Sequence, residues 1–471
     1  MFRTIKSFKS AIILLIFFVS ASGGMMVSCT SQEVVNQDAY ILVTGRRLPY
    51  VYAISLEAAL DPSNHNTSKA IIGRSKVALD RLDGQLLGDP ANLLVSEDVR
   101  TLYVINHHGS IDNGEFRQHG GRGQIAVLDV DKILDPRNNG TANALVRHMD
   151  SGGFGAIGAV LLPDMVIISN AENNLTEDGG NRIGFVDRRT GSLRTTVELP
   201  LGTPPNASGD IDCGDYPVPY VAPYGPPRNL AVLSSSPSFG CFPNPNGLAM
   251  GRASNGRRYL FTANGGTNDV SVIDLELALE GDRLAEIHRI PNQLGAWGIA
   301  ATPDARHIIV AHGGSQQEDV SGNTISFINV DRASTGANDA EVARLLVGTD
   351  DPTVETHPLI PSVTPDGKEL IIPNLLVDNV SIVNIELALA GDPGAEVARI
   401  PLSRSNGASV RPKGSAITAD GKYALISAGP GSQPYTQETG MVYVIELETR
   451  RVVGTVTGVG NDPYGLAVVY R

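Results

Sequence analysis

Four of the nine histidines stand beside short apolar runs and a fifth lies in the loop that follows two of them, so their side chains could bind a metal ion. Imidazole is the commonest protein ligand for zinc and also suits copper, so histidines gathered by the fold could hold either ion. No metal-binding spacing such as HExxH accompanies them. The alternative is structural, since a polar side chain at a strand end often hydrogen-bonds the backbone of the next turn. The candidate ligands are His107, His108, His119, His312 and His357.

A second group of side chains carries positive charge. Arg46 and Arg47 follow an apolar run near the N-terminal end, while Arg411 and Lys413 precede one near the C-terminal end. If the fold joins these ends, the four side chains could bind a carboxylate or phosphate by paired hydrogen bonds. The alternative is ordinary solvated surface residues. Three residues at equivalent places are further candidate ligand contacts: Asn264, Trp297 and Tyr464.

Other motifs that could carry chemistry are absent or out of context. The run 153–158 matches GxGxxG, but it leads into an apolar strand rather than a helix, which argues against a dinucleotide site. Neither GxSxG nor GxxxxGK[ST] occurs. Carboxylates such as Glu172, Glu177 and Asp178 have no spacing that singles out an acid/base pair. Catalytic residues therefore cannot be assigned from the sequence.

An internal repeat must position these residues. Each copy has an apolar strand, a turn of the Pro-Asp-Gly type, a second strand often ending in Asn, a loop and a third strand. The clearest copies begin at Trp297, His357 and Arg411. Strands of four to six residues joined by hairpins indicate four-stranded antiparallel sheets. The similar segments 275–282 and 385–392 link third to fourth strands, and we expect each to form a helical turn.

The repeat occurs seven times. The residues that end the second strands mark the copies: Gly45, Asn106, Asn170, Asn264, His312, Asn374 and Ala428. The widest spacing contains an insertion at 201–244. The chain closes on a first strand after Gly465 and opens on a second strand, so its two ends should share one sheet and close a ring without free edges. We therefore expect an all-β fold, a single seven-bladed propeller over 39–471.

Closure of this ring brings the ends of the second strands and the starts of the first strands to one face. Ligands of propellers usually bind on that face, over the central channel. The sequence places the following residues there: Arg46, Arg47, Asp89, His107, His108, Asn170, Glu172, Asn246, Asn264, Trp297, His312, His357, Asn374, Arg411, Lys413 and Tyr464. We expect the site, whatever its ligand, to be drawn from this group.

The repeats resemble the YVTN-type seven-bladed propeller proteins over nearly all of residues 39–471. The resemblance rests on Tyr-Val-Ile-Asn at 103–106, Phe-Thr-Ala-Asn at 261–264 and the Pro-x-Gly runs that start first strands. It implies the fold but not the activity, because related propellers include exported binding proteins, lactonases and the propeller domains of nitrite and nitrous-oxide reductases. WD40, kelch and quinoprotein propellers are disfavoured, because Trp297 is the only Trp.

The N-terminal segment is typical of an export signal. Basic residues precede the apolar run 11–19, which is too short for a comfortable membrane span and is followed by small residues. Cys29 follows Met-Val-Ser, which resembles a bacterial lipobox with Met where Leu is usual. We expect removal of 1–28, lipid on Cys29 and a tether at 29–38. An ordinary signal peptide with an incidental Cys is the alternative.

Two further cysteines, Cys213 and Cys241, would then lie in an exported and oxidising compartment. A disulfide between them would close a loop of about 28 residues and contribute roughly 3 kcal/mol to stability. Two free thiols are the alternative. No CxxC or CxxCH occurs, which excludes a c-type haem and a thiolate zinc site.

Composition limits the partners. A net charge of −13 argues against nucleic acid, and removal of the basic signal segment makes the chain more acidic. We expect an exported cell-envelope lipoprotein that binds a small molecule, metal or protein partner on its loop-rich face. The alternative is a periplasmic enzyme, either of lactonase type or a copper- or zinc-dependent oxidoreductase with an unidentified redox partner, that uses the histidines.

Overall fold

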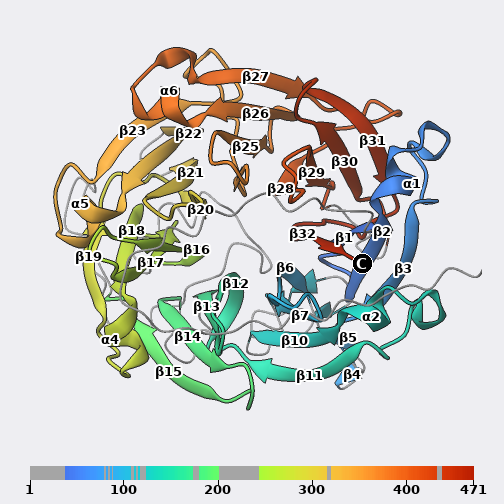
Figure 1. Cartoon of the computed structure of the whole chain (residues 1–471), viewed down its shortest axis with the longest axis horizontal. Helices are drawn as coiled ribbons and strands as arrows, with labels where there is room; N and C mark the ends of the chain where they lie inside the picture. The colour runs from blue at the N-terminus through green and yellow to red at the C-terminus, as the bar shows by residue number, and fades with distance from the viewer. Residues whose placement is uncertain are drawn as a thin grey trace, which may run out of the picture. The chain divides into compact units, whose positions relative to one another are not determined.

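The computed structural model describes most of the chain after residue 37 (Figure 1). The described residues are 38–78, 81–82, 85–86, 89–107, 111–112, 115–116, 123–172, 180–200, 243–315, 320–431 and 437–471. Five residues that the sequence singles out lie outside them: Cys29, Cys213, Cys241, His108 and His119. The insertion also lies outside them, except for its last two residues. The expected lipidation, the expected disulfide and two of the candidate metal ligands therefore stay predictions.

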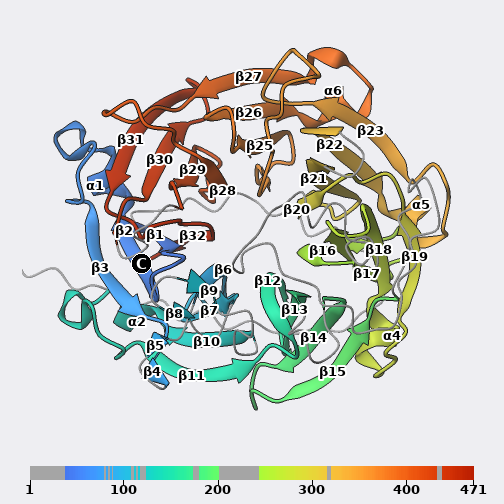
Figure 2. The same ribbon diagram turned by 180° about the vertical axis from the view of Figure 1, so that it is seen from behind.

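Within the unit Gln37–Arg471, seven four-stranded antiparallel sheets stand around a common axis (Figures 1 and 2). This confirms the fold predicted from the repeats. From blade 1 to blade 7, the innermost strands are β32 (Leu466–Tyr470), β6 (Pro90–Val95), β12 (Phe154–Leu161), β16 (Pro245–Arg252), β20 (Ala296–Ala301), β24 (Ser362–Val363) and β28 (Pro412–Ile417). The second strands are β1 (Ala39–Thr44), β7 (Thr101–Asn106), β13 (Met165–Glu172), β17 (Arg258–Asn264), β21 (His307–Ser315), β25 (Glu369–Asn374) and β29 (Tyr423–Ala428).

The outer half of each blade holds the third and fourth strands. The third strands are β2 (Tyr50–Ser55), β10 (Gln124–Asp129), β14 (Arg182–Asp187), β18 (Asp269–Asp274), β22 (Val320–Asn329), β26 (Asn379–Asn384) and β30 (Met441–Glu446). The fourth strands are β3 (Ile71–Lys76), β11 (Leu145–Asp150), β15 (Leu193–Glu198), β19 (Glu286–Ile290), β23 (Glu341–Leu346), β27 (Glu396–Pro401) and β31 (Arg451–Thr457). Their Val and Ile side chains suit a pleated surface buried between neighbouring blades.

The two ends of the chain share blade 1, as the sequence predicted. Strand β32 pairs antiparallel with β1, and Leu42 lies opposite Ala467. The Asp38 N–H donates to the Arg471 carbonyl at 2.8 Å, and the Arg471 N–H donates back to the Asp38 carbonyl at 3.0 Å. Val469 of β32 is fully buried. The last strand of the chain therefore closes the ring and pairs the inner edge of β1.

The hairpin turns between first and second strands follow one local rule. In blade 6, the Thr364 hydroxyl donates to Asp366 at 2.7 Å, and the same Asp oxygen accepts the N–H of Lys368. Gly367 has a φ of 73° and Gly421, its equivalent in blade 7, has a φ of 70°. Glycine reaches these angles without the steric cost that a Cβ imposes. These angles confirm the positive φ expected of the Asp-Gly turns.

Short helices link the third and fourth strands. They are α1 (Leu56–Leu60), α2 (Val130–Ile133), α4 (Leu275–Leu279), α5 (Val330–Ser334) and α6 (Ile385–Leu389), with 3₁₀ turns η1 (Pro62–Asn64), η2 (Pro136–Asn138) and η4 (Pro393–Ala395). Helices α4 and α6 confirm the predicted helical turns. Asp274 and Asn384 cap them by accepting backbone N–H groups. No described helix is long and apolar enough to cross a membrane.

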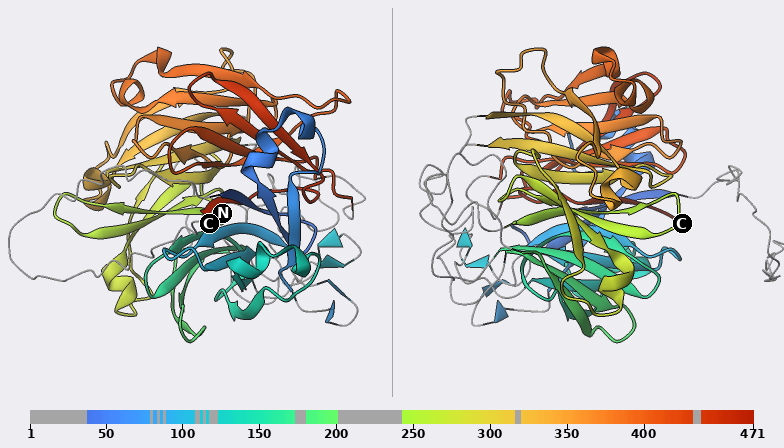
Figure 3. Two further views of the ribbon diagram at one scale, coloured as in Figure 1. Left: turned by 45° about the vertical axis from the view of Figure 1, so that its right-hand side comes forward. Right: turned by 90° about the vertical axis from the view of Figure 1, so that its left-hand side faces the viewer.

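An additional small sheet was not predicted. It consists of β4 (Arg81–Leu82), β5 (Gln85–Leu86), β8 (Ile111–Asp112) and β9 (Glu115–Phe116). It arises from the link into blade 2 and from the loop that follows β7. Figure 3 shows this sheet and the C-terminus at opposite faces of the propeller. We call the face where second strands end and first strands begin the mouth.

Candidate functional site

Five charged side chains converge at the mouth where blades 7, 1 and 2 meet. Arg46 and Arg47 follow β1, Asp89 precedes β6, Lys413 is in β28, and Asp462 precedes β32. Each is exposed by 9% or less. Buried charges are rare in proteins and are paired or hydrogen-bonded where they occur. We call these five residues the charged cluster.

Direct contacts hold the cluster together. Arg46 Nε lies 3.7 Å from Asp89 Oδ2, and the Arg47 backbone N–H donates to Asp89 Oδ1 at 3.0 Å. Lys413 Nζ forms an ion pair with Asp462 Oδ1 at 2.7 Å. It also donates to two backbone carbonyls, those of Arg411 and Gly429. The cluster is therefore tied to the backbone of blade 7 and to the starts of two innermost strands.

Tyr464 lies against two of these cations. The Arg46 guanidinium carbon is 4.4 Å from the centre of the Tyr464 ring, and Lys413 Nζ is 5.7 Å from it. Cations within about 6 Å of an aromatic face are attracted by its electron density. The attraction of the ring for both cations offsets part of their mutual repulsion.

The charges of the cluster influence one another. Burial by itself would raise the pKa of the Asp462 carboxyl, but neighbouring cations outweigh burial and hold this pKa below its ordinary value of 3.8. These cations are Lys413, Arg46 and Arg47. Burial lowers the pKa of the Lys413 ammonium below 10.5, and the charges of Arg411 and Arg46 act in the same direction, against Asp462. Asp462 is therefore ionised at neutral pH, whereas Lys413 gives up its proton more readily than an exposed lysine.

The fourth basic residue expected at this place does not join the cluster. Arg411 is exposed, and its guanidinium donates to the Pro430 carbonyl at 3.2 Å. Its backbone N–H donates to Asp378 at 2.8 Å. Arg411 and Lys413, two residues apart, thus differ in burial because only Lys413 lies within the ladder of β28.

The described histidines do not converge. His107 is 3% exposed and its Nδ1 lies 3.2 Å from the Ala156 carbonyl. His357 has a φ of 51°, and its Nδ1 lies 3.7 Å from Glu355 Oε1. His312 is enclosed within blade 5. Among the residues described, no group of three or more His, Cys, Asp or Glu side chains has a geometry that could hold a metal ion.

Asn side chains at the ends of second strands form a structural series. Asn264 donates from Nδ2 to Asp269 Oδ1 and to Ser271 Oγ, both at 2.7 Å. In blade 6, Asn374 donates to the equivalent Asn379 and Ser381. These bonds run to side chains of the third strand rather than to the turn backbone, which the structural alternative expected. Asn264, a candidate ligand contact, is thus engaged within its own blade.

His312 occupies the same position in blade 5. Its Nδ1 lies 2.9 Å from Thr324 Oγ1 and accepts from Arg344 Nη1 at 3.0 Å, so Nε2 carries the proton and donates to Gln293 Oε1 at 2.9 Å. Burial first, and then the Arg344 charge, hold the pKa of His312 well below its usual value. His312 is therefore a neutral histidine whose two nitrogens both have protein partners.

We expect His312→Asn to be tolerated better than His312→Leu. The amide can reach Thr324 and Ser326 as Asn264 reaches their equivalents, so we expect a loss of about 1 kcal/mol. Leucine would remove the partner of Thr324 Oγ1 and one of the donors to Gln293 Oε1 from a fully buried site, at a cost of roughly 3 kcal/mol. Urea unfolding curves of the two variants test this difference. Equal losses would contradict the proposed hydrogen-bond role.

Trp297 packs against side chains of two other blades. Its indole comes from β20 of blade 5 and packs against Ala91 of blade 2 and against Ile157 and Ala171 of blade 3. Blade 2 stands across the ring from blade 5, and blade 3 is separated from blade 5 by blade 4 (Figure 1). The indole is only partly buried, whereas the three side chains beneath it are buried. Trp297 and these three residues form what we call the apolar floor of the mouth.

Asp462 is the one cluster residue that the sequence analysis did not single out. A signal was present, because Asp462-Pro463 and Asp89-Pro90 occupy equivalent positions immediately before innermost strands. Proline at the start of a strand needs no ladder hydrogen bond for its nitrogen. The repeated Asp-Pro pair could have marked both carboxylates as mouth residues.

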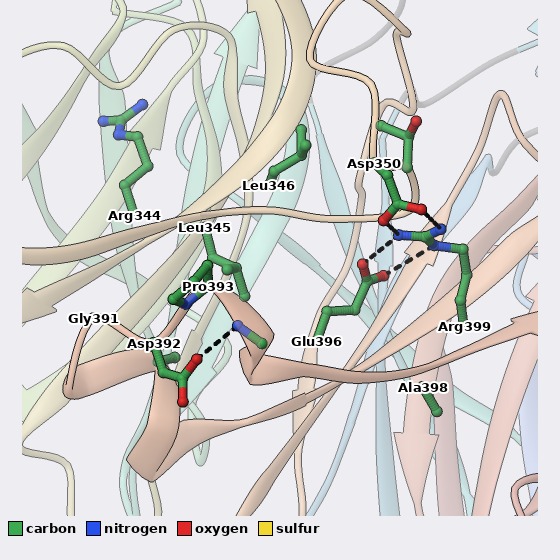
Figure 4. A pocket seen from close by; sticks show the side chains of 13 residues that line it. Arg344, Leu345, Leu346, Asp350, Gly391, Asp392, Pro393, Glu396, Ala398 and Arg399 are labelled. Carbon is green, nitrogen blue, oxygen red and sulfur yellow. Dashed lines mark hydrogen bonds and ion pairs between the residues drawn. The ribbon is translucent and has the colours of Figure 1, made fainter.

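A cavity of about 700 Å³ between the outer strands of blades 5 and 6 is a second candidate site (Figure 4). Arg399 in its wall donates to Asp350 at 3.1 Å and to Glu396 at 2.6 Å. Arg344, at the other side, donates to Glu341. These two arginines are outnumbered by the three carboxylates that they bind, Glu341, Asp350 and Glu396. The charged cluster instead has three cations and two carboxylates, so it is the better candidate for an anion.

Comparisons with known proteins support the fold. No family model matches the chain, and no curated protein matches it. Among solved structures, a periplasmic gluconolactonase from Pseudomonas aeruginosa is 13% identical, with a TM-score of 0.56 over 92% of this chain and 99% of that one.

Two further structures have similar scores. A protein from Bacteroides uniformis described as a candidate 6-phosphogluconolactonase is 14% identical, with a TM-score of 0.55 over 92% of this chain and all of that one. A protein of unknown function from Desulfotomaculum acetoxidans is 12% identical, with a TM-score of 0.54 over 91% and 98% of the two chains. At such identities the similarity establishes a propeller like those of lactonases, and nothing about activity.

Proposed function

We propose that this protein is an exported, lipid-anchored propeller that binds a small anionic molecule at its mouth. Arg46, Arg47 and Lys413 supply the positive charge. Guanidinium groups bind carboxylate and phosphate through paired, charge-assisted hydrogen bonds, and an ammonium adds a point charge. Asp89 and Asp462 orient these cations before the ligand arrives.

One observation carries the proposal. Three cations from blades 1 and 7, each exposed by 9% or less, converge at the mouth where blades 7, 1 and 2 meet. A group of buried charges with shifted pKa values in a concave site is a common mark of function. The low local dielectric would strengthen their attraction for an anion well beyond that of surface lysines. We place binding ahead of lactone hydrolysis because the similarity to lactonases rests on the fold alone.

Calorimetric titration of the mature protein with inorganic phosphate tests the proposal. We expect Arg46→Gln and Lys413→Met to weaken binding at least about tenfold, the effect of losing one charge-assisted hydrogen bond of about 1.4 kcal/mol. Arg451→Gln, on the exposed side of β31, is the control and should bind normally.

The same titration should depend on pH in one direction. Burial lowers the pKa of Lys413, so its positive charge is lost at a lower pH than in an exposed lysine. Phosphate affinity should therefore fall as the pH rises through that lowered pKa, and Lys413→Met should remove this dependence. Wild-type protein that binds no phosphate, or variants that bind as tightly as Arg451→Gln, would refute the proposal.

The lipid anchor is tested separately. In a bacterial host that processes lipoproteins, we expect the wild type to sediment with membranes and Cys29→Ser to be found in the soluble fraction. A cysteine-to-serine change at Cys213 serves as the matched control and should leave the fractionation unchanged. Sedimentation of Cys29→Ser with the membranes would show that the lipobox interpretation is wrong.

A further inference from the structure

The mouth combines the charged cluster with an apolar surface. Trp297, Ala91, Ile157 and Ala171 form the apolar floor, and none of these four side chains except the indole carries a polar atom. A partly exposed indole that packs on these side chains offers a flat apolar face, for which aromatic rings are well-matched partners. The floor therefore favours a ligand with an apolar ring over one covered with hydroxyl groups.

The floor and the cluster are adjacent. Ala91 lies two residues after Asp89, about 7 Å along strand β6, and Asp89 forms the ion pair with Arg46. The Ala91 carbonyl also accepts from the Gly465 N–H at 3.1 Å and from the Thr44 hydroxyl at 3.5 Å. These bonds join the floor to the two segments of blade 1 that lead into the cluster. One small molecule can therefore span both.

We infer that the ligand is a monocyclic aromatic acid, with a short carbon chain between the ring and its carboxylate. This inference rests on the proposed anion binding and specifies the ligand. The carboxylate binds Arg46, Arg47 and Lys413, while the ring stacks on Trp297. An aromatic contact of this kind strengthens binding by up to about tenfold.

The chain itself provides the probe, because Trp297 is its only tryptophan. Fluorescence of the mature protein is recorded during titration with 3-phenylpropionate, with propionate and with gluconate. We expect saturable quenching by 3-phenylpropionate, and a Kd about tenfold below that of propionate measured by calorimetry. Trp297→Leu should bind both acids equally, with the affinity that the wild type has for propionate. Trp297→Phe keeps an aromatic face and should retain part of the preference.

The other possible results of these titrations each contradict either the aromatic ligand or the proposed anion binding. Equal Kd values for the two acids in the wild type, both weakened by Arg46→Gln, would overturn the aromatic ligand and leave anion binding intact. Tighter binding of gluconate, lost in Trp297→Leu, would replace the aromatic acid by a sugar acid and also overturn this inference. Absence of binding by all three acids and by phosphate would overturn the proposed function itself. If Trp297→Leu fails to fold, Trp297→Phe and the wild-type comparison still decide between these results.

Discussion

A chain that stops at Gly465, and so lacks β32, is expected to lose cooperative unfolding. The deletion removes the inner strand of blade 1, including the fully buried Val469, and exposes the edge of β1. The loss of the hydrogen bonds between β32 and β1, together with the loss of buried apolar surface, should lower the free energy of unfolding by roughly 5–10 kcal/mol. That is comparable to the whole folding free energy of a typical protein. Urea denaturation followed by circular dichroism, together with size-exclusion chromatography, measures the effect.

The matched control removes only Arg471. This residue forms an ion pair with Asp131 at 2.9 Å and donates to the Val99 carbonyl at 2.6 Å, both near the surface. Its loss also removes the two backbone hydrogen bonds that it exchanges with Asp38, and it should lower the unfolding free energy by about 2 kcal/mol. A chain ending at Gly465 that stays monomeric and unfolds like the control would show that blade 1 does not depend on closure.

The second large effect concerns Asp462. Asp462→Ala leaves Lys413 buried beside two arginines without its carboxylate, and breaking a buried pair in this way costs about 3–5 kcal/mol. In the wild type, ionised Asp462 contributes to the free energy of unfolding at any pH above the ordinary carboxyl pKa of 3.8. This contribution is lost as the pH falls through the lowered pKa of Asp462 in the folded protein. The stability difference between the two proteins should therefore shrink in acid.

A double variant separates pairing from packing. In Lys413→Met with Asp462→Leu, both charges of the pair are replaced by apolar side chains, and we expect stability within about 1 kcal/mol of the wild type or above it. The same variant should no longer bind phosphate. Chemical denaturation of the single and double variants measures the coupling. A double variant as unstable as Asp462→Ala would indicate that the pair serves the fold rather than a ligand.

The fold could be predicted from the sequence because its causes are local and repeated. Runs such as 103–106 and 261–264 end in Asn, as do four of the seven second strands, and Asp-Gly turns such as Asp366-Gly367 set the hairpins of blades 6 and 7. Seven repetitions, with a final run that matches a first strand, require closure. The small sheet β4–β5–β8–β9 escaped prediction because its two-residue strands leave no hydrophobic period to detect.

The site could be predicted only in part. The sequence placed Arg46, Arg47 and Lys413 at one mouth, but it treated them as one patch with Arg411. Burial separates them, and burial depends on three blades that are far apart in the chain. His312 and Asn264 illustrate the same limit, because their partners Ser326 and Ser271 lie on third strands, where a lone Ser carries no signal of its own.

The reciprocal hydrogen bonds between Asp38 and Arg471 have a consequence for engineering. Because the two ends of the propeller touch, the ring has no structural reason to begin at blade 1. A circular permutant can join residue 471 to residue 38 by a short glycine linker and open instead at the exposed turn around Asn255 and Gly256. The new chain ends would emerge from blade 4 on the face opposite the mouth. All strand pairing and the charged cluster would be retained.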